Sequence, residues 1–203
     1  VAQNGMQHCK LYLTEYPDPD MLFDDEYFFS YNIENKVSVL QLVEKENTND
    51  TIGYLGNLFN TNDLFRFTSK SLSNLDFSTL NQYDFIIAKG LTDISTGLSS
   101  ELINYTNQGG SLLVFPSSTI NLDTYKNFLQ RVSGCNLLAL DTGSTKVSYL
   151  NLEHPIYKDV FDKIPDNVDL PKVNQHYVIS FANFSGTEYL MNLQNGNSFL
   201  SST

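Results

Sequence analysis

In the middle of the chain, apolar residues occur in two patterns, the short runs of buried strands and the spacing of a helix. Short apolar runs at 83–88 and 111–115 have polar borders, as buried strands do. Between them, residues 98–106 carry apolar side chains at helical spacing, and Gly109–Gly110 ends that helix. A strand, a helix and a second strand in succession predict two parallel strands.

The same strand and helix patterns continue on both sides of this unit. The run at 36–43 is apolar on both faces, which is typical of a central strand in a parallel sheet. A helix is expected after Asn49–Thr51, an edge strand at 64–68, and a second helix over 122–132 that ends at Gly134. We therefore predict an α/β fold, a flavodoxin-like three-layer sandwich with a mainly parallel sheet of order 2-1-3-4.

Strand patterns also flank this core. After a polar start, strands are expected at 10–15 and 27–33, so residues 1–35 are predicted to be the tail of a preceding β domain or an addition to the sheet. Residues 36–203 are predicted to form one α/β domain. Its β-rich end is expected to add antiparallel strands to the same sheet, after an irregular or helical segment around 159–164, at 136–140, 146–150, 173–181, 188–193 and 198–200.

Charge and cysteine content narrow the classes of function. The 203 residues carry a formal net charge of -11, which argues against a nucleic-acid partner and against docking on anionic lipid. Cys9 and Cys135 have no metal-ligand spacing, so a disulfide and two unpaired thiols both stay open. The acidic residues of 18–26 lack the spacing of a calcium loop. No metal and no cofactor is predicted.

The chain has no apolar stretch long enough to cross a bilayer and no signal peptide. It begins at Val1 and stops at Thr203 directly after a strand pattern, so both ends look cut. We expect a soluble fragment of a longer protein.

In a flavodoxin-like sheet, ligands bind at the carboxyl ends of the strands. The residues predicted there as candidate ligand contacts are Lys89, Thr92, Asp93 and Ser117. A phosphate loop is not expected, because the first strand is not followed directly by glycines. A phospho-receiver is disfavoured as well, since Lys89 stands where its aspartate would be.

The turn after Phe115 is where a nucleophile elbow would lie. It contains Ser117 and Ser118, without the flanking glycines and without a cysteine. His154 is the one histidine in a loop near acids, Glu153 and Asp159, and is the candidate for a catalytic base. The plainer interpretation is that the serines cap a helix and that His154 hydrogen-bonds its own loop.

The unit from Tyr83 to Val114 resembles the class I glutamine amidotransferase-like fold, including its trehalose-utilisation-type relatives. In more detail, the chain is similar to the soluble C-terminal region of bacterial membrane proteins that begin with an aerotolerance-type, BatA-like double-membrane-anchor domain. The matching segments, in order, are 25–31, Gly109–Gly110, 154–161, 169–171 and 195–200.

This resemblance implies an anchored parent protein in the cell envelope, more in the periplasm than in the cytoplasm, with other envelope proteins as partners. It does not imply amidotransferase activity. Amidotransferases use an elbow cysteine and a His-Pro-Glu motif, whereas the elbow has no cysteine and His154–Pro155 is followed by Ile156.

Three functions follow as hypotheses. The first is a non-catalytic scaffolding or ligand-sensing domain. The second is a hydrolase or amidotransferase that uses Ser117 or Ser118 with His154. The third, carbohydrate binding, has little support, because most Tyr and Phe residues fall at positions that face the core.

Overall fold

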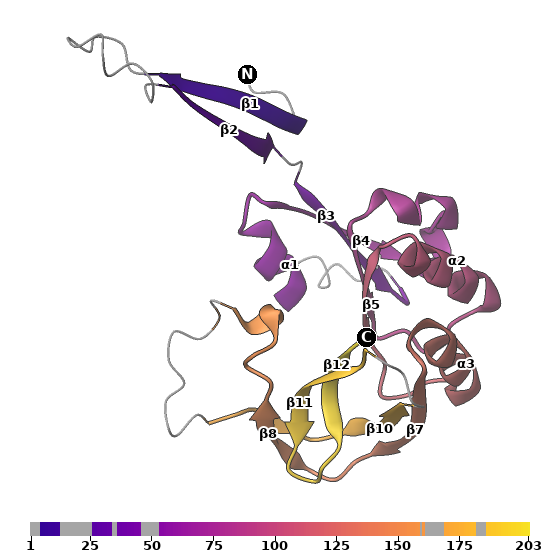
Figure 1. Ribbon diagram of the computed structural model, residues 1–203. Coiled ribbons are helices and arrows are strands. Elements are labelled where there is room, and N and C mark those ends of the chain that lie inside the picture. Colours follow the sequence, from indigo (N-terminus) through magenta and orange to yellow (C-terminus); the bar gives the residue numbers. More distant parts are fainter. Residues whose placement is uncertain are drawn as a thin grey trace.

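The computed structural model describes residues 5–12, 26–33, 36–45, 53–158, 160, 169–181 and 186–203, with side chains described only up to Tyr31 in the second of these ranges. Figure 1 shows a hairpin that projects from the N-terminal side, an α/β part below it, and antiparallel sheets at the opposite end. No helix in the described ranges is long and apolar enough to span a bilayer.

The parallel sheet is as predicted. Its strands are β3 (Val37–Val43), β4 (Phe65–Ser71), β5 (Phe85–Lys89) and β6 (Ser111–Phe115). They pair in parallel in the order β4-β3-β5-β6, which confirms the order 2-1-3-4. Every residue from Val39 to Val43 is buried, as a central strand with layers on both faces requires.

Helices cover both faces of this sheet. The short helix α1 (Tyr54–Asn60) packs Phe59 against Val39 and Ile87 on one face. Helices α2 (Thr96–Asn107) and α3 (Leu122–Ser133) cover the other face, where the largest buried cluster lies. The 3-10 turns η2 (Leu72–Asn74) and η3 (Phe77–Gln82) connect β4 to β5. The α/β part is therefore a three-layer sandwich.

Short-range contacts explain where two of these helices begin and end. The Ser95 hydroxyl accepts the Leu98 N–H at 3.3 Å and caps the start of α2. At the end of α3, Gly134 has a φ of 66°, a left-handed conformation in which glycine is favoured. This glycine turns the chain from α3 directly into β7.

The C-terminal strands are antiparallel, but they do not extend the parallel sheet. Strand β7 (Cys135–Asp141) pairs with β10 (His176–Phe181). A separate sheet has the order β12-β11-β8-β9. Its strands are β8 (Thr145–Leu150), β9 (Lys172–Val173), β11 (Glu188–Leu193) and β12 (Ser198–Ser202), with the 3-10 turn η4 (Pro155–Tyr157) after β8.

The expected addition to one sheet is thus wrong, and the reason is the place of α3. Strand β7 follows this helix after a single glycine and packs against it. It therefore lies on the helix layer and not at the free edge of β6.

The N-terminal strands also differ from the prediction. Strand β1 (Gly5–Tyr12) begins five residues before the expected 10–15 and pairs with β2 (Glu26–Ile33) in an antiparallel hairpin. The polar start therefore includes strand residues. Positions 13–15, the rest of the acidic segment before Glu26, and most of the expected segment at 159–164 lie outside the described residues.

Candidate functional site

The candidate site is the carboxyl edge of the parallel sheet, which faces the antiparallel sheets (Figure 1). Two loops form this edge, one after β5 and one after β6. Backbone hydrogen bonds join them: Gly90 N–H donates to Phe115 O at 2.7 Å, and Asn121 N–H donates to Thr92 O at 2.8 Å. Gly90 has a φ of 67°, which allows the tight turn out of β5.

Acidic side chains at this edge are used to hold the loops. Glu44, just after β3, accepts the Thr92 N–H at 3.0 Å. Asp93 accepts the hydroxyl hydrogen of Thr124, on α3, at 2.7 Å. The structure therefore brings the predicted Thr92 and Asp93 to one edge, where both of these groups bind other parts of the protein.

Two tyrosines complete this framework. Tyr125 of α3 donates to Leu91 O at 2.7 Å, and Tyr177 of β10 donates to Ser117 O at 2.8 Å. Burial raises the pKa of Tyr125, and the nearby Tyr177, Glu44 and Asp93 raise it further; burial also raises the pKa of Tyr177. Both hydroxyls therefore stay protonated and act as donors.

Sequence reasoning missed the role of these tyrosines. Tyr125 fits the apolar face of a helix, and Tyr177 fits an ordinary strand pattern. Only the fold brings Tyr177 to Ser117, 60 residues earlier in the chain.

The elbow serines lie in the loop after β6. The Ser117 hydroxyl accepts the Thr119 N–H at 3.3 Å, which closes a local turn within that loop. Ser118 is exposed. Backbone hydrogen bonds hold this loop to the loop after β5, and Tyr177 of β10 holds it from the other side. The loop thus lies where a nucleophile elbow would lie, but the Ser117 hydroxyl is used to close the local turn.

His154 is bonded to its own segment and to β11. Its Nδ1 accepts the Ile156 N–H at 3.2 Å, which caps η4, and its Nε2 lies 3.6 Å from a carboxylate oxygen of Glu188. Within the described part of the chain, its hydrogen bonds do not reach Ser117 or Ser118. The acid beside this ring is Glu188, 34 positions further on, a pairing that sequence spacing could not reveal.

Lys89 ends β5 on the face covered by α1, and it pairs in register with Phe115. The same face includes Gln41 of β3, which lies beside Ser69 and Ile87. Gln41 is fully buried, and neither polar atom of its amide has a hydrogen-bond partner among the described residues.

We expect Gln41→Leu to raise the free energy of unfolding by about 1–3 kcal/mol, because it removes a buried amide whose polar atoms have no partner in the described part of the chain. Denaturant unfolding measures this change. Gln130→Leu, on the exposed side of α3, is the matched control and is expected to stay within about 0.5 kcal/mol of the parent. A loss of stability in Gln41→Leu would show that the amide is hydrogen-bonded after all.

Cysteine chemistry and metal binding have little support. Both cysteines are free thiols, which resolves the open question of a disulfide between them. Burial raises the pKa of Cys135 to about 11, so this thiol is unreactive at neutral pH. In the described ranges, no three His, Cys, Asp or Glu residues are grouped as metal ligands would be.

Comparison with known proteins reveals a structural likeness only. No family model matches the sequence, and no curated protein matches it. The crystal structure of a protein described as ThuA-like, from Bacteroides uniformis, is similar with a TM-score of 0.59 at 15% identity, over 89% of this chain and 72% of that one. The chain thus has the class I glutamine amidotransferase-like fold of this neighbour, with additional antiparallel sheets.

Proposed function

We propose that this protein is a non-catalytic amidotransferase-like domain that acts as a scaffold or ligand sensor in a membrane-anchored protein of the cell envelope. One observation carries the non-catalytic part: the groups that an active relative would need are bonded to the framework. Ser117 closes its own turn, and His154 caps η4. Catalysis of acyl transfer needs a hydroxyl or thiol within hydrogen-bond reach of its base.

The membrane anchor, the envelope partners and the periplasmic side rest on the resemblance in segment order described above. The full-length sequence tests this part of the proposal. Membrane-spanning segments on one or both sides of these residues would support it, and a complete chain without any would contradict it.

The alternative is a hydrolase or amidotransferase in which Ser117 or Ser118 acts with His154. The pairing of His154 Nε2 with Glu188 favours it, since a carboxylate commonly orients the imidazole of a catalytic base. The same pairing leaves Nδ1 as the nitrogen for proton abstraction, and Nδ1 accepts the Ile156 N–H. The alternative therefore requires η4 to release this nitrogen.

An activity assay separates the two. We expect no hydrolysis of L-glutamine or p-nitrophenyl acetate above the rate that the Ser117→Ala, Ser118→Ala and His154→Ala variants give, because no nucleophile is activated. His8→Ala is the control, since His8 lies on the distant hairpin, where its ring forms a hydrogen bond with Ser30. Turnover that drops by about 100-fold or more in a serine variant and in His154→Ala, but not in His8→Ala, would establish the alternative.

A further inference from the structure

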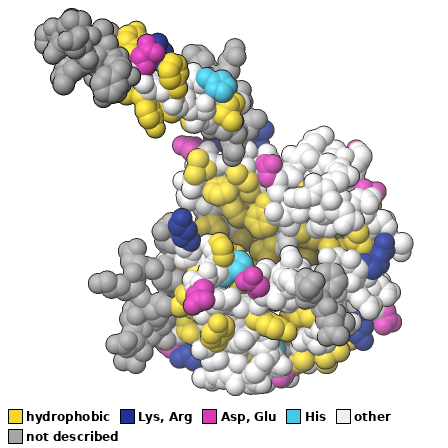
Figure 2. Space-filling model, viewed as in Figure 1, with side chains coloured by type: hydrophobic (Ala, Val, Ile, Leu, Met, Phe, Trp, Pro, Cys, Tyr) yellow, Lys and Arg dark blue, Asp and Glu magenta, His cyan; other side chains and the backbone are white. Residues whose placement is uncertain are grey.

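The hairpin of β1 and β2 extends away from the rest of the described chain (Figure 1). His8 forms a hydrogen bond with Ser30, and Lys10 donates to Glu26, so both side chains bond within the hairpin itself. An isolated two-stranded hairpin is marginally stable at best in water. Figure 2 shows that it nevertheless exposes many hydrophobic side chains, alongside charged ones. The hairpin thus has an apolar surface without a cover among the described residues.

The register divides this hairpin into two unlike faces. On one face Lys10 forms an ion pair with Glu26 and lies over the rings of Tyr12 and Phe28. The other face, which we name the aromatic face, has no charged side chain within the described strands. It is formed by three opposed pairs: Gln7 with Tyr31, Cys9 with Phe29, and Leu11 with Tyr27.

The aromatic face has a regular relief. The three rings follow one another along β2, with stacked neighbours whose centroids are 6.2 and 6.3 Å apart. The opposed residues on β1 are smaller, so a ridge of rings lies beside a lower row. A second copy, related by a twofold axis parallel to the strands, would place its ridge over this lower row and receive the ridge of the first in return.

Charge and area both suit such a pair. Each copy carries a net charge of -11, yet the aromatic face is uncharged and the hairpin holds its acid–base pair on the other side, so face-to-face packing buries no charge. The exposed fractions of Tyr27, Phe29, Tyr31 and Leu11 are 66%, 42%, 47% and 61%. At roughly 200 Å² for a full side chain, two copies would bury about 900 Å², the size of a weak, transient interface.

From these observations we infer that the aromatic face is a homodimerisation surface, on which the hairpins of two copies pack face to face. Interfaces smaller than about 1,200 Å² are typical of weak, transient encounters, so we expect a dimer that forms only at high protein concentration.

Sedimentation equilibrium over a concentration range of about 5–500 µM tests this dimer. We expect the parent protein to dimerise and Phe29→Ser to raise the dissociation constant at least about tenfold, because a central ring of the ridge is lost. Phe28→Ser is the matched control: Phe28 is the next residue, is 67% exposed, and lies on the other face. A parent that stays monomeric throughout, or a Phe28→Ser variant as impaired as Phe29→Ser, would overturn the inference.

Cys9 provides a measurement that needs no substitution. It lies in the middle of the aromatic face, whereas Cys135 is buried and its raised pKa keeps it slow to react. We expect the rate of Cys9 alkylation by N-ethylmaleimide to fall as protein concentration rises through the dissociation constant. A rate independent of concentration contradicts the dimer, as does a monomer that sediments with phosphatidylcholine vesicles, which would assign the face to a lipid surface.

Discussion

Gly110→Ala is expected to lower the free energy of unfolding by about 3 kcal/mol, the upper range for overpacking a well-filled core. An alanine Cβ at this position would lie 2.3, 2.4 and 2.5 Å from three carbons of the Tyr105 ring. These distances are far inside van der Waals contact. Either the ring or the backbone between α2 and β6 has to move.

Neither can move easily. Tyr105 is buried in the main core, and its hydroxyl donates to Ser111 O at 3.2 Å. The Gly110 N–H donates to Tyr105 O at 3.0 Å, which ties the glycine to the same residue. Gly110 therefore allows α2 to end close against the start of β6, and the pair Gly109–Gly110 marks a close approach as well as a helix end.

Denaturant unfolding monitored by circular dichroism measures the effect, and Gly97→Ala in α2 is its control. A Cβ at Gly97 would have the Phe77 ring at 3.6 Å, an ordinary contact. Alanine is favoured over glycine in a helix by about 1 kcal/mol, so this variant is expected to gain stability. Equal effects of the two substitutions would mean that the Tyr105 contact does not constrain the turn.

The parallel core could be predicted because its signals are local. Residues 37–43 are apolar on both faces, and the turn at Gly109–Gly110 separates a helix period from a strand run. The order of the strands then followed from right-handed crossovers and short connections. These features depend on neighbours in the sequence, and the structure contains them as predicted.

The predictions that failed concern contacts between segments far apart in the sequence. Periodicity identified strands in the C-terminal part but could not say which partners they choose, so β7 was expected in the wrong sheet. For the same reason, the sequence did not predict the tyrosine donors at the carboxyl edge or the contact between Glu188 and His154. The early start of β1 was missed because Gln7 and His8 are polar residues in a strand with both faces exposed to some degree.

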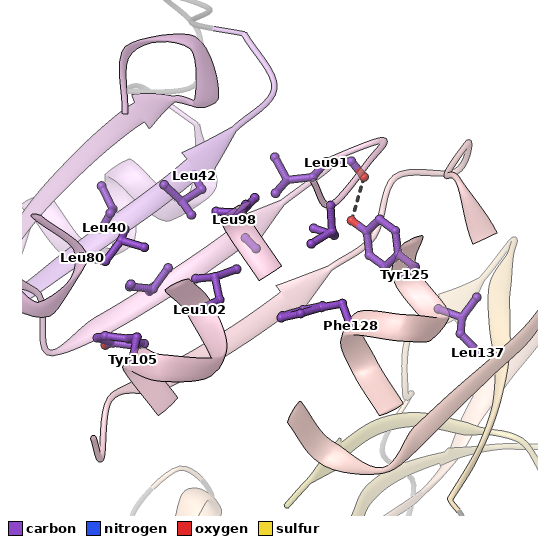
Figure 3. Close-up of a cluster of buried hydrophobic side chains, with 13 residues drawn as sticks. Leu40, Leu42, Leu80, Leu91, Leu98, Leu102, Tyr105, Tyr125, Phe128 and Leu137 are labelled. Atoms are coloured by element: carbon purple, nitrogen blue, oxygen red, sulfur yellow. Dashed lines mark hydrogen bonds between the residues drawn. The ribbon is translucent and has the colours of Figure 1, made fainter. Parts of the chain in front are cut away.

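Phe128→Ala is expected to cost about 3–5 kcal/mol, the usual loss for a fully buried phenylalanine. Phe128 lies on α3 in the main cluster, which also contains Leu102 of α2 and Leu137 of β7. Figure 3 shows Tyr125 and Phe128 between the parallel strands and Leu137. The substitution therefore opens a cavity where α3 joins the parallel layer to the antiparallel strands.

Because Phe128 lies between the parallel and antiparallel parts, the number of unfolding transitions is as informative as the midpoint. Tyr177 and Ile179 of β10 pack on the same cluster as Leu40 and Ile86 of the parallel sheet. A shared core of this kind predicts one cooperative transition in the parent and in Phe128→Ala, with the midpoint shifted to lower denaturant.

Phe115→Ala, at the end of β6, is the matched control. Its side chain is 44% exposed, so it leaves less of a cavity and is expected to cost about half as much or less. Two separate transitions in the parent, only one of them moved by Phe128→Ala, would mean that the antiparallel part folds as a unit of its own. Residues 36–203 would then be two domains, and the carboxyl edge of the sheet would lie at the boundary between them, where Tyr177 of β10 donates to Ser117 O.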